Sequence, residues 1–268
     1  MRQKKISGQS SKLYWAKQAR THRTHSDASW SDREVLGLEV YNLLKYLNDG
    51  DRVLDVGCAN GHATLQFARQ KKIRIRGVDF IPEMIRHART NLKRTSSSLR
   101  GKADFKVDNV MSLEEPDAIY DKVIVIRVII NLDRWNDQLR SLRECGRVLK
   151  PGGTLLLSEA TLQGWGRLND FRREWRLPDI PMPAFNNYLD EKKVMKALCG
   201  KLELLAVNNF ASTYYVGTRV IKPLLIQALG TGMDPANPNM EWNRYFARLP
   251  QAGDYGPQKL FVFRKRSV

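Results

Sequence analysis

The sequence predicts an α/β fold, a doubly wound and mostly parallel sheet of seven strands with helical and loop insertions. Short apolar runs alternate with helical segments of roughly 10–15 residues from Arg52 onward, which is the rhythm of βαβ units. The first run leads into a glycine-containing turn that opens a helix. The 268 residues are 42% hydrophobic and 27% charged, so they suffice for one large core and do not resemble a disordered chain.

The N-terminal part, residues 1–34, is predicted to be a basic segment that covers the rest of the protein. Its first 25 residues hold seven lysines and arginines and no acid. Ser31 and Glu34 have the spacing of a capping box, which predicts that a helix begins at Ser31. The helices predicted in this part of the chain cover residues 11–20 and 31–48.

Residues 35–160 are predicted to form a core of alternating strands and helices. The strands are expected at 52–56, 73–78, 104–107, 122–126 and 154–158, and the helices at 62–70, 82–93 and 135–148. Parallel neighbours need such crossovers, which are right-handed. The sequence therefore places five strands in one parallel sheet.

The rhythm breaks after residue 160. Residues 161–190 are rich in Trp, Arg, Pro and Asn, and we expect an irregular insertion that forms a lid over the substrate. Residues 191–268 are expected to complete the sheet, with a second insertion at 211–258. The elements predicted here are helices at 191–198 and 218–229, and strands at 202–208 and 259–264. Long irregular insertions are usually functional, so we expect them to select the substrate.

The turn after the first strand favours binding of a nucleotide-like cofactor. Gly57 and Gly61 allow backbone to approach a ligand closely, and the helix that follows offers free N–H groups. Asp79 ends the second strand, 22 residues after Gly57, where an acid can accept hydrogen bonds from ribose hydroxyls. Asp108 follows the third strand and can accept from an exocyclic amine. The alternative interpretation is a tight strand–helix turn without function, with Asp79 capping the helix that starts at Pro82 and Asp108 in a plain turn.

Four segments together resemble the class I S-adenosylmethionine-dependent methyltransferases. They are Asp55-x-Gly57-x-x-x-Gly61, Gly77-Val78-Asp79, Val107-Asp108 and Leu149-Lys150-Pro151-Gly152-Gly153. The resemblance covers about residues 35–160, and it departs at Ala59, where glycine is commoner in the family. It implies S-adenosylmethionine as cofactor, with Asp79 on the ribose and Asp108 on the adenine amine. The cofactor-binding residues that it implies are Asp55, Gly57, Cys58, Ala59, Gly61, Asp79, Phe80, Asp108, Asn109, Val110, Arg127 and Trp30.

Methyl transfer is an in-line displacement, and a hydroxyl acceptor also has to lose a proton. His25 in the cover segment and Glu159 at the end of the fifth strand are the groups expected to take it, and the resemblance places Arg127 near the transferred methyl. We expect no metal. The residues expected to line the substrate pocket are Asn131, Trp165, Asn186, Tyr188, Tyr214 and Arg219.

The expected acceptor is a small polar molecule, and the group expected to be methylated is a hydroxyl of a sugar or a glycan-linked metabolite. Trp15, His25, Ser29-Trp30 and Glu39 ahead of the glycine turn, with Arg127 after the fourth strand, resemble methyltransferases found with polysaccharide pathways. Methyltransferases that act on amino groups of nucleic-acid bases carry Asn/Asp-Pro-Pro-aromatic after the fourth strand. This chain has Ile126-Arg127-Val128-Ile129 there, which argues against that class.

Two alternatives to a small-molecule enzyme stay open, and the net charge of +17 favours the first of them. Residues 69–106 hold twelve lysines and arginines against three acids, as an RNA methyltransferase could, although aromatic residues suited to single strands are missing. A cofactor-binding subunit without catalysis is the other alternative.

Three scattered cysteines and no apolar leader or membrane-spanning run predict a cytoplasmic protein. The sequence leaves the oligomeric state open.

Overall fold

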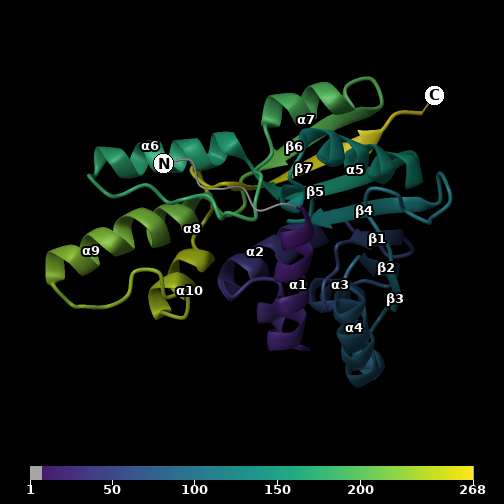
Figure 1. Ribbon diagram of the computed structural model, residues 1–268, viewed down its shortest axis with the longest axis horizontal. Helices are drawn as coiled ribbons and strands as arrows, with labels where there is room; N and C mark the ends of the chain where they lie inside the picture. Colours follow the sequence, from purple (N-terminus) through teal and green to yellow (C-terminus); the bar gives the residue numbers. More distant parts are fainter. Residues whose placement is uncertain (1–7, 268) are drawn as a thin grey trace.

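The architecture is a seven-stranded sheet with helices on both faces, seen in a computed structural model that describes residues 8–267 (Figure 1). The strand order is β3-β2-β1-β4-β5-β7-β6. The strands are β1 Arg52–Val56, β2 Arg74–Asp79, β3 Lys102–Val107, β4 Tyr120–Ile126, β5 Leu149–Ala160, β6 Leu202–Asn208 and β7 Gln258–Lys265. The predicted sheet is confirmed in strand number and in its mostly parallel character.

The sheet changes winding direction between β1 and β4. Strands β1 to β5 pair in parallel, and β1 pairs with β2 on one side and β4 on the other. Only β7 runs antiparallel, where it lies between β5 and β6. In doubly wound sheets the crevice at such a switch point is where ligands bind, at the carboxyl ends of the strands.

Alternate residues of each strand point to opposite faces and build two separate cores. Val53 and Ile124 pack with α2 and α3, whereas Leu54 and Val123 pack with α5 and α7. Figure 1 shows α5 and α7 above the sheet, and α1 to α4 below it. The bounds of these helices are α1 Gly8–His22, α2 Arg33–Leu44, α3 His62–Gln70, α4 Pro82–Thr95, α5 Trp135–Val148 and α7 Glu191–Leu198.

Helix α2 differs from its prediction at both ends. It begins at Arg33, and Asp32, not Ser31, is its N-cap, because the Asp32 carboxylate accepts from the Val35 N–H at 3.4 Å. Asp32 is almost fully buried, since Tyr214 and Arg219 of the C-terminal insertion also bind it. These long-range partners fix the cap, and a local capping-box pattern cannot reveal them.

The segment predicted to be irregular contains a regular helix, α6 Leu162–Glu174, so that prediction is wrong. Thr161 is its N-cap and accepts from the Gly164 N–H at 3.1 Å. Figure 1 shows α6, α9 and α10 forming a lobe at one end of the molecule. The other helical elements of this lobe are α8 Ser212–Val216, a π-helical turn Gly217–Ile221, α9 Lys222–Leu229 and α10 Glu241–Arg248. Across residues 8–267, no helix is long and apolar enough to span a bilayer.

Candidate active site

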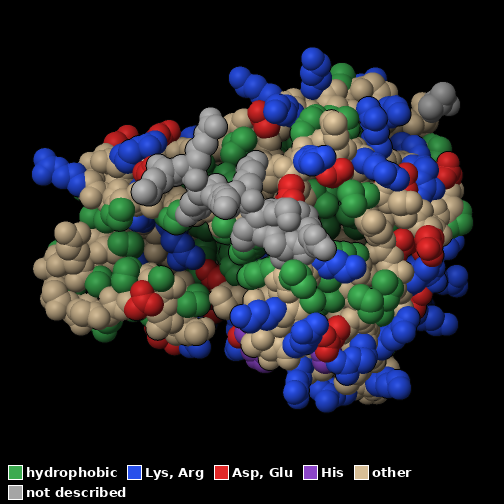
Figure 2. Space-filling model, viewed as in Figure 1, with side chains coloured by type: hydrophobic (Ala, Val, Ile, Leu, Met, Phe, Trp, Pro, Cys, Tyr) green, Lys and Arg blue, Asp and Glu red, His purple; other side chains and the backbone are tan. Residues whose placement is uncertain are grey.

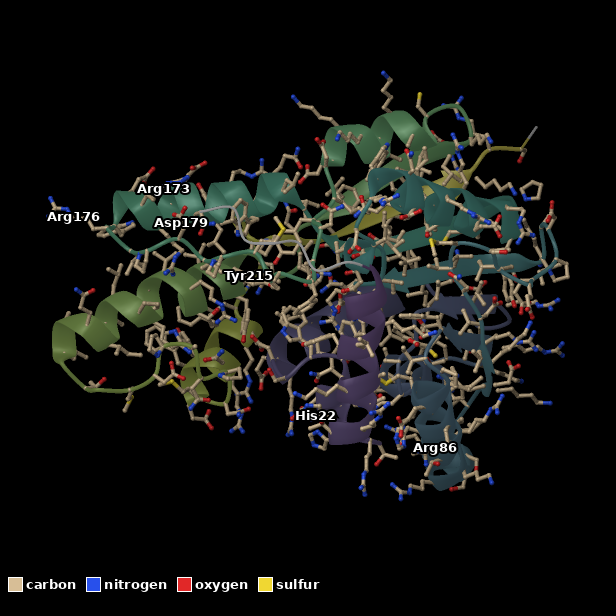
Figure 3. The ribbon with its side chains drawn as sticks, viewed as in Figure 1. His22, Arg86, Arg173, Arg176, Asp179 and Tyr215 are labelled. Carbon is tan, nitrogen blue, oxygen red and sulfur yellow. The ribbon has the colours of Figure 1, made fainter. Side chains whose placement is uncertain are left out.

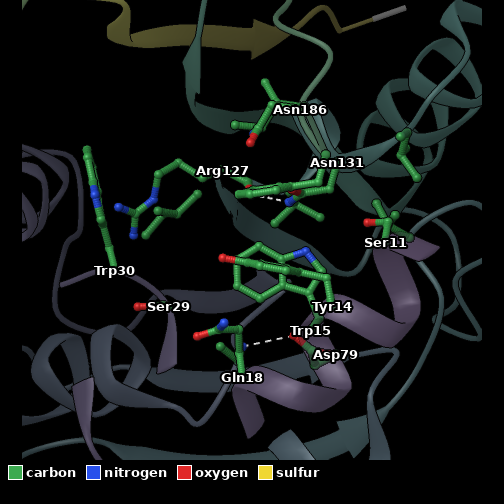
Figure 4. Close-up of a pocket in the computed structure, with 18 of the residues that line it drawn as sticks. Ser11, Tyr14, Trp15, Gln18, Ser29, Trp30, Asp79, Arg127, Asn131 and Asn186 are labelled. Atoms are coloured by element: carbon green, nitrogen blue, oxygen red, sulfur yellow. Dashed lines mark hydrogen bonds between the residues drawn. The ribbon is translucent and has the colours of Figure 1, made fainter. Parts of the chain in front are cut away.

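A cavity of about 610 Å³ opens at the carboxyl ends of the central strands (Figure 4). Gly57 after β1, Asp79 at the end of β2, Asp108 after β3 and Arg127 after β4 all line it. Helix α1 forms a wall, and Tyr215 lies between the lobe and the sheet (Figure 3). The strand order thus gathers four turns that are far apart in the sequence.

The turn after β1 requires a glycine at position 57. Gly57 has φ +74°, and a Cβ there would lie 2.1 Å from Cγ2 of Val128, which also lines the cavity. Ala59 has φ +48° and lines the cavity as well. Gly61 has a different task, because its Cβ would lie 2.6 Å from the Phe105 ring and it does not line the cavity. Gly61, expected to contact the cofactor, instead allows the start of α3 to pack closely on β3.

Asp79 presents a fixed carboxylate to the cavity. Its Oδ2 accepts from the Ala59 N–H at 3.0 Å, and its Oδ1 from the Ile81 N–H at 2.9 Å. Burial raises its pKa to about 6, while the two N–H groups act in the opposite direction. Each oxygen keeps a lone pair, so the carboxylate can accept from hydroxyl groups of a ligand.

Asp108 is held in the same way at the end of β3. It accepts from the N–H groups of Asn109 at 2.7 Å and Glu114 at 3.1 Å. Asn109 and Val110 line the cavity beside it, as does Phe80, a residue that is 41% exposed. This end of the cavity therefore offers a carboxylate and a free aromatic surface.

Two residues expected to touch the cofactor instead lie outside the cavity lining. Asp55 is buried and accepts from Thr64 Oγ1 at 2.5 Å, which ties β1 to α3, and burial raises its pKa to about 7. Cys58 packs with Leu65 and Ile85 in a small core. Neither side chain lines the cavity, and both stabilise the turn through buried contacts on its other side.

The N-terminal segment covers the cavity with one face of α1. Five residues at helical spacing line it, and they are Ser11, Tyr14, Trp15, Gln18 and His22. Asn60, in the turn after β1, donates through Nδ2 to the carbonyl oxygens of Arg23 at 3.0 Å and His25 at 2.6 Å. The end of the cover is thus bound directly to the glycine turn.

His25 lies outside the cavity, which contradicts the catalytic role expected for it. Its Nδ1 is 3.2 Å from an Asp27 oxygen, and its Nε2 is 3.1 Å from Nη2 of Arg33. It faces a second hollow between α2 and α3, beside His62. The preceding turn, held by Asn60, directs the ring away from the strand ends.

Glu159 does not line the cavity either, because its side chain is completely buried. Its Oε1 accepts from the N–H groups of Val128 at 2.8 Å and Ile129 at 2.7 Å. Burial raises its pKa to about 8, and these N–H groups oppose the rise. Glu159 therefore holds the turn after β4 rather than facing the acceptor.

Arg127 lines the cavity, and its guanidinium lies over the Trp30 ring with Cζ 4.3 Å from the centroid (Figure 4). Its Nη2 is 3.5 Å from Oε2 of Glu39, a buried acid of α2. Trp30 also lines the cavity. These two residues, expected to lie near the cofactor, thus form a stacked pair on the cavity wall.

Half of the expected substrate residues line the cavity. Asn131, Asn186 and Tyr188 do so. Trp165, Tyr214 and Arg219 do not, because each is engaged elsewhere. Trp165 Nε1 donates to the Ile180 carbonyl at 2.8 Å. The Tyr214 hydroxyl donates to Asp32 Oδ1 at 2.7 Å, and Arg219 Nη2 lies 3.3 Å from Asp32 Oδ2.

Sequence comparison matches residues 53–153 to the methyltransferase domain family. This matched part of the chain is a methyltransferase domain, and it is similar to S-adenosylmethionine-dependent methyltransferases. The chain is 30% identical over 117 residues to 27-O-demethylrifamycin SV methyltransferase of Amycolatopsis mediterranei, covering 43% of this chain and 41% of that protein. It is 35% identical over 111 residues to the ubiquinone biosynthesis O-methyltransferase of Xanthomonas campestris, covering 41% and 43%. The chain thus spans less than half the length of these relatives.

Solved structures share the fold of this protein along nearly the whole chain. A chain from the complex of the Haloferax volcanii Trm112 methyltransferase activator with a methyltransferase has a TM-score of 0.64 at 19% identity, covering 94% of this chain and 98% of that one. The [4+2]-cyclase SpnF has a TM-score of 0.61 at 20% identity, covering 98% of both. At such identities the likeness concerns the fold alone.

The residues present fit S-adenosylmethionine, the cofactor of the family. The Asp79 carboxylate, oriented by two backbone N–H groups, suits a ribose diol. Asp108 and the free face of Phe80 suit an aminated ring. Side chains that could fill the space are absent at Gly57 and small at Ala59. The donor and acceptor groups therefore match a nucleoside along β1, β2 and β3.

Several residues that line the cavity lie outside the site proposed from the sequence. Tyr14 stacks on Phe185 with ring centroids 4.2 Å apart, and both line the cavity with Gln258. The spacing of Ser11, Tyr14, Trp15, Gln18 and His22 on one helix face was the available signal for the α1 wall. Phe185 and Gln258 carry no local signal, because their place depends on how the insertions fold back.

Proposed function

We propose that this chain transfers the methyl group of S-adenosylmethionine to a hydroxyl group of a small molecule. The observation that carries the proposal is a single cavity shared by two sets of residues. Gly57, Asp79 and Asp108 follow β1, β2 and β3, while Arg127 and Tyr188 belong to the other half of the sheet edge. One cavity can therefore hold a nucleoside and an acceptor side by side.

The cofactor, when bound, supplies an electrophilic methyl group. The chain's own residues bind and orient the two reactants and exclude water. Asp79 and Asp108 supply fixed acceptors for the nucleoside, and the α1 wall with Trp15 closes the cavity from above. Because Asn60 binds the end of the cover to the glycine turn, cover and turn are held together around the ligand.

The acceptor that we propose is a ring compound with a hydroxyl group. Tyr14, Trp15, Phe185, Tyr188 and Tyr215 give the cavity aromatic walls, which bind flat or weakly polar faces. A sugar ring, free or glycan-linked, is the finer class that the sequence favours, and sugars do stack on such side chains. Asn131 and Asn186 supply amides for its hydroxyls.

The test combines binding with turnover. Calorimetry with S-adenosylhomocysteine measures the cofactor half, and we expect saturable binding of one molecule per chain. Transfer of labelled methyl groups is then measured on nucleotide sugars, glycans, phenols and hydroxylated polyketides. Products with a methyl ether support the proposal. Binding of the nucleoside without transfer to any hydroxyl would favour a silent partner subunit instead.

An RNA acceptor is the second candidate, favoured by one basic face. Figure 2 shows lysine and arginine side chains gathered over α4, where Arg86, Lys93 and Arg94 are exposed. A salt series with generic RNA separates the candidates, since phosphate contacts give a log–log slope of several units. Specific methylation of RNA would replace our proposal. A weak and salt-sensitive association without methylation would leave it intact.

We also propose a reducing compartment, the cytoplasm, for the protein. Within the described residues Cys58, Cys145 and Cys199 are all free thiols, and the first two are buried. Free buried thiols are usual where disulfides do not form. The insertions at 161–190 and 211–258 are proposed to shape the acceptor half, since Phe185, Tyr188 and Tyr215 come from them.

A further inference from the structure

We infer that the acceptor carries a carboxylate, and that Arg127 binds this group with a guanidinium held by Glu39 and Trp30. The inference rests on the proposed function and names a property of its substrate. The observation behind it is a mostly buried arginine side chain whose donors have no hydrogen-bond acceptor in the described protein.

The backbone at Arg127 is held in an unusual conformation. Arg127 has φ +54°, a region that residues other than glycine seldom adopt. Its N–H donates to the Ser158 carbonyl at 2.9 Å, and its carbonyl accepts from Asn131 Nδ2 at 2.7 Å. These bonds hold the residue so that its side chain leaves β4 toward Trp30, along the cavity wall.

The guanidinium is nearly enclosed, since only 14% of the side chain is exposed. Within residues 8–267 no hydrogen bond reaches it, and its Nη1 is buried without a partner. A guanidinium has five N–H donors and no acceptor. Buried donors of this kind are normally satisfied, so a ligand group that accepts hydrogen bonds is the missing partner.

Glu39 and Trp30 fix the guanidinium from two sides. Glu39 is fully buried, and its Oε1 accepts from Ser158 Oγ and from Gln258 Nε2, the latter at 2.9 Å. Its other oxygen faces Arg127 at 3.5 Å, too far for a strong hydrogen bond. Trp30 stacks on the flat face. The planar fork of the guanidinium is therefore oriented, and its Nη1 keeps no hydrogen-bond partner within the described residues.

The strand order places this fork on the acceptor side. Along the sheet edge, Asp108, Asp79 and Gly57 follow β3, β2 and β1, and Arg127 follows β4, the next strand. Gln258, at the start of β7, lies still further along and lines the same cavity. The nucleoside half is thus complete without Arg127.

A carboxylate is the group that suits this fork best. Among the described residues that line the cavity, Arg127 is the sole lysine or arginine, and the other ionisable side chains include five aspartates. Among these described lining residues, Arg127 is therefore the permanently charged partner for an anionic substituent of the acceptor. The planar fork matches a carboxylate through two parallel hydrogen bonds, and the aromatic walls suit the ring that bears it.

The experiment compares two probes that differ only in this group. Calorimetry on the full chain saturated with S-adenosylhomocysteine measures the affinity of 3,4-dihydroxybenzoate and of catechol. We expect the carboxylate-bearing probe to bind roughly 10- to 100-fold more tightly, as charge-assisted hydrogen bonds allow. Arg127→Gln should remove the preference, and Arg127→Lys should keep a smaller one. Equal affinities in the unaltered protein, failure of both probes included, overturn the inference.

Three controls separate the inference from other roles of Arg127. Glu39→Gln should reduce the ratio of the two affinities, and Glu39→Asp should restore part of it, which a purely structural role would not do. S-adenosylhomocysteine and methylthioadenosine differ in the amino acid part. If Arg127→Gln weakens only the former, the guanidinium serves the cofactor carboxylate and the inference is wrong. If the unaltered protein binds neither nucleoside, it is the proposed function that fails.

Discussion

Replacing Glu159 by glutamine tests whether this acid is structural. The carboxyl group is completely buried, and it accepts from the N–H groups of Val128 at 2.8 Å and Ile129 at 2.7 Å. Burial raises its pKa to about 8 from an ordinary value of 4.5. Glutamine keeps an oxygen that can accept the same bonds and cannot ionise.

The expected effect on stability follows from linkage. Because the folded pKa lies above the unfolded one, the folded state binds more protons at intermediate pH. The free energy of unfolding therefore falls as the pH rises from about 4.5 to about 8, the range between the two pKa values. For these two values the loss between pH 6 and pH 8 is about 2 kcal/mol. In Glu159→Gln, the free energy of unfolding should no longer show this loss between pH 6 and pH 8.

Urea unfolding at pH 6 and pH 8 measures the difference. The control is Glu203→Gln, an exposed acid paired with Arg264 whose pKa is lowered and which does not titrate in this range. Identical pH dependence in the protein with and without Glu159 would refute the linkage argument. Methyl transfer should survive Glu159→Gln within a few-fold. If turnover vanished while folding and cofactor binding stayed normal, Glu159 would be catalytic after all.

Four further results are expected. Asp79→Asn should weaken S-adenosylhomocysteine binding by about 1–3 kcal/mol in calorimetry. Since the carboxylate has a pKa of about 6, the affinity of the unaltered protein should fall below that pH and the variant should lose this dependence. Gly57→Ala should abolish binding or folding, because its Cβ would lie 2.1 Å from a Val128 methyl at φ +74°. His25→Ala should change turnover less than two-fold or so, and a larger loss would contradict its place outside the cavity. Asn60→Ala should speed limited proteolysis of the cover, since it removes bonds to Arg23 and His25.

The sheet could be predicted because its signals are local. Arg52–Val56 and Tyr120–Ile126 are apolar runs buried on both faces, and their helices follow at regular intervals. Helix α6 was not predicted because one of its residues, Gly164, is set by packing against a distant segment of the chain. A Cβ on Gly164 would lie 2.2 Å from the Gly256 carbonyl oxygen, so glycine stands inside this helix for packing, at the expense of helix propensity.

The residues of the candidate site also fall into two groups, those set by local sequence signals and those set by long-range contacts. Asp79 and Asp108 could be placed because the end of a parallel strand always reaches the same sheet edge. Tyr214 and Arg219 could not, because both turn inward to Asp32, which lies about 180 residues earlier in the chain. Only folded insertions decide which of their polar residues face a cavity. The position of Asp79 and Asp108 thus follows from local strand ends, whereas that of Tyr214 and Arg219 depends on contacts between distant segments.

The reversal of winding between β1 and β4 lets the two halves of the molecule vary independently. The strands that carry Gly57, Asp79 and Asp108 are on one flank, and the later strands with their long excursions are on the other. Similarity in sequence to the methyltransferase domain family ends at residue 153, within β5, before either excursion begins. Under the proposed function, a different insertion after β5 would change the acceptor. It would leave the residues after β1, β2 and β3 that bind the methyl donor unchanged.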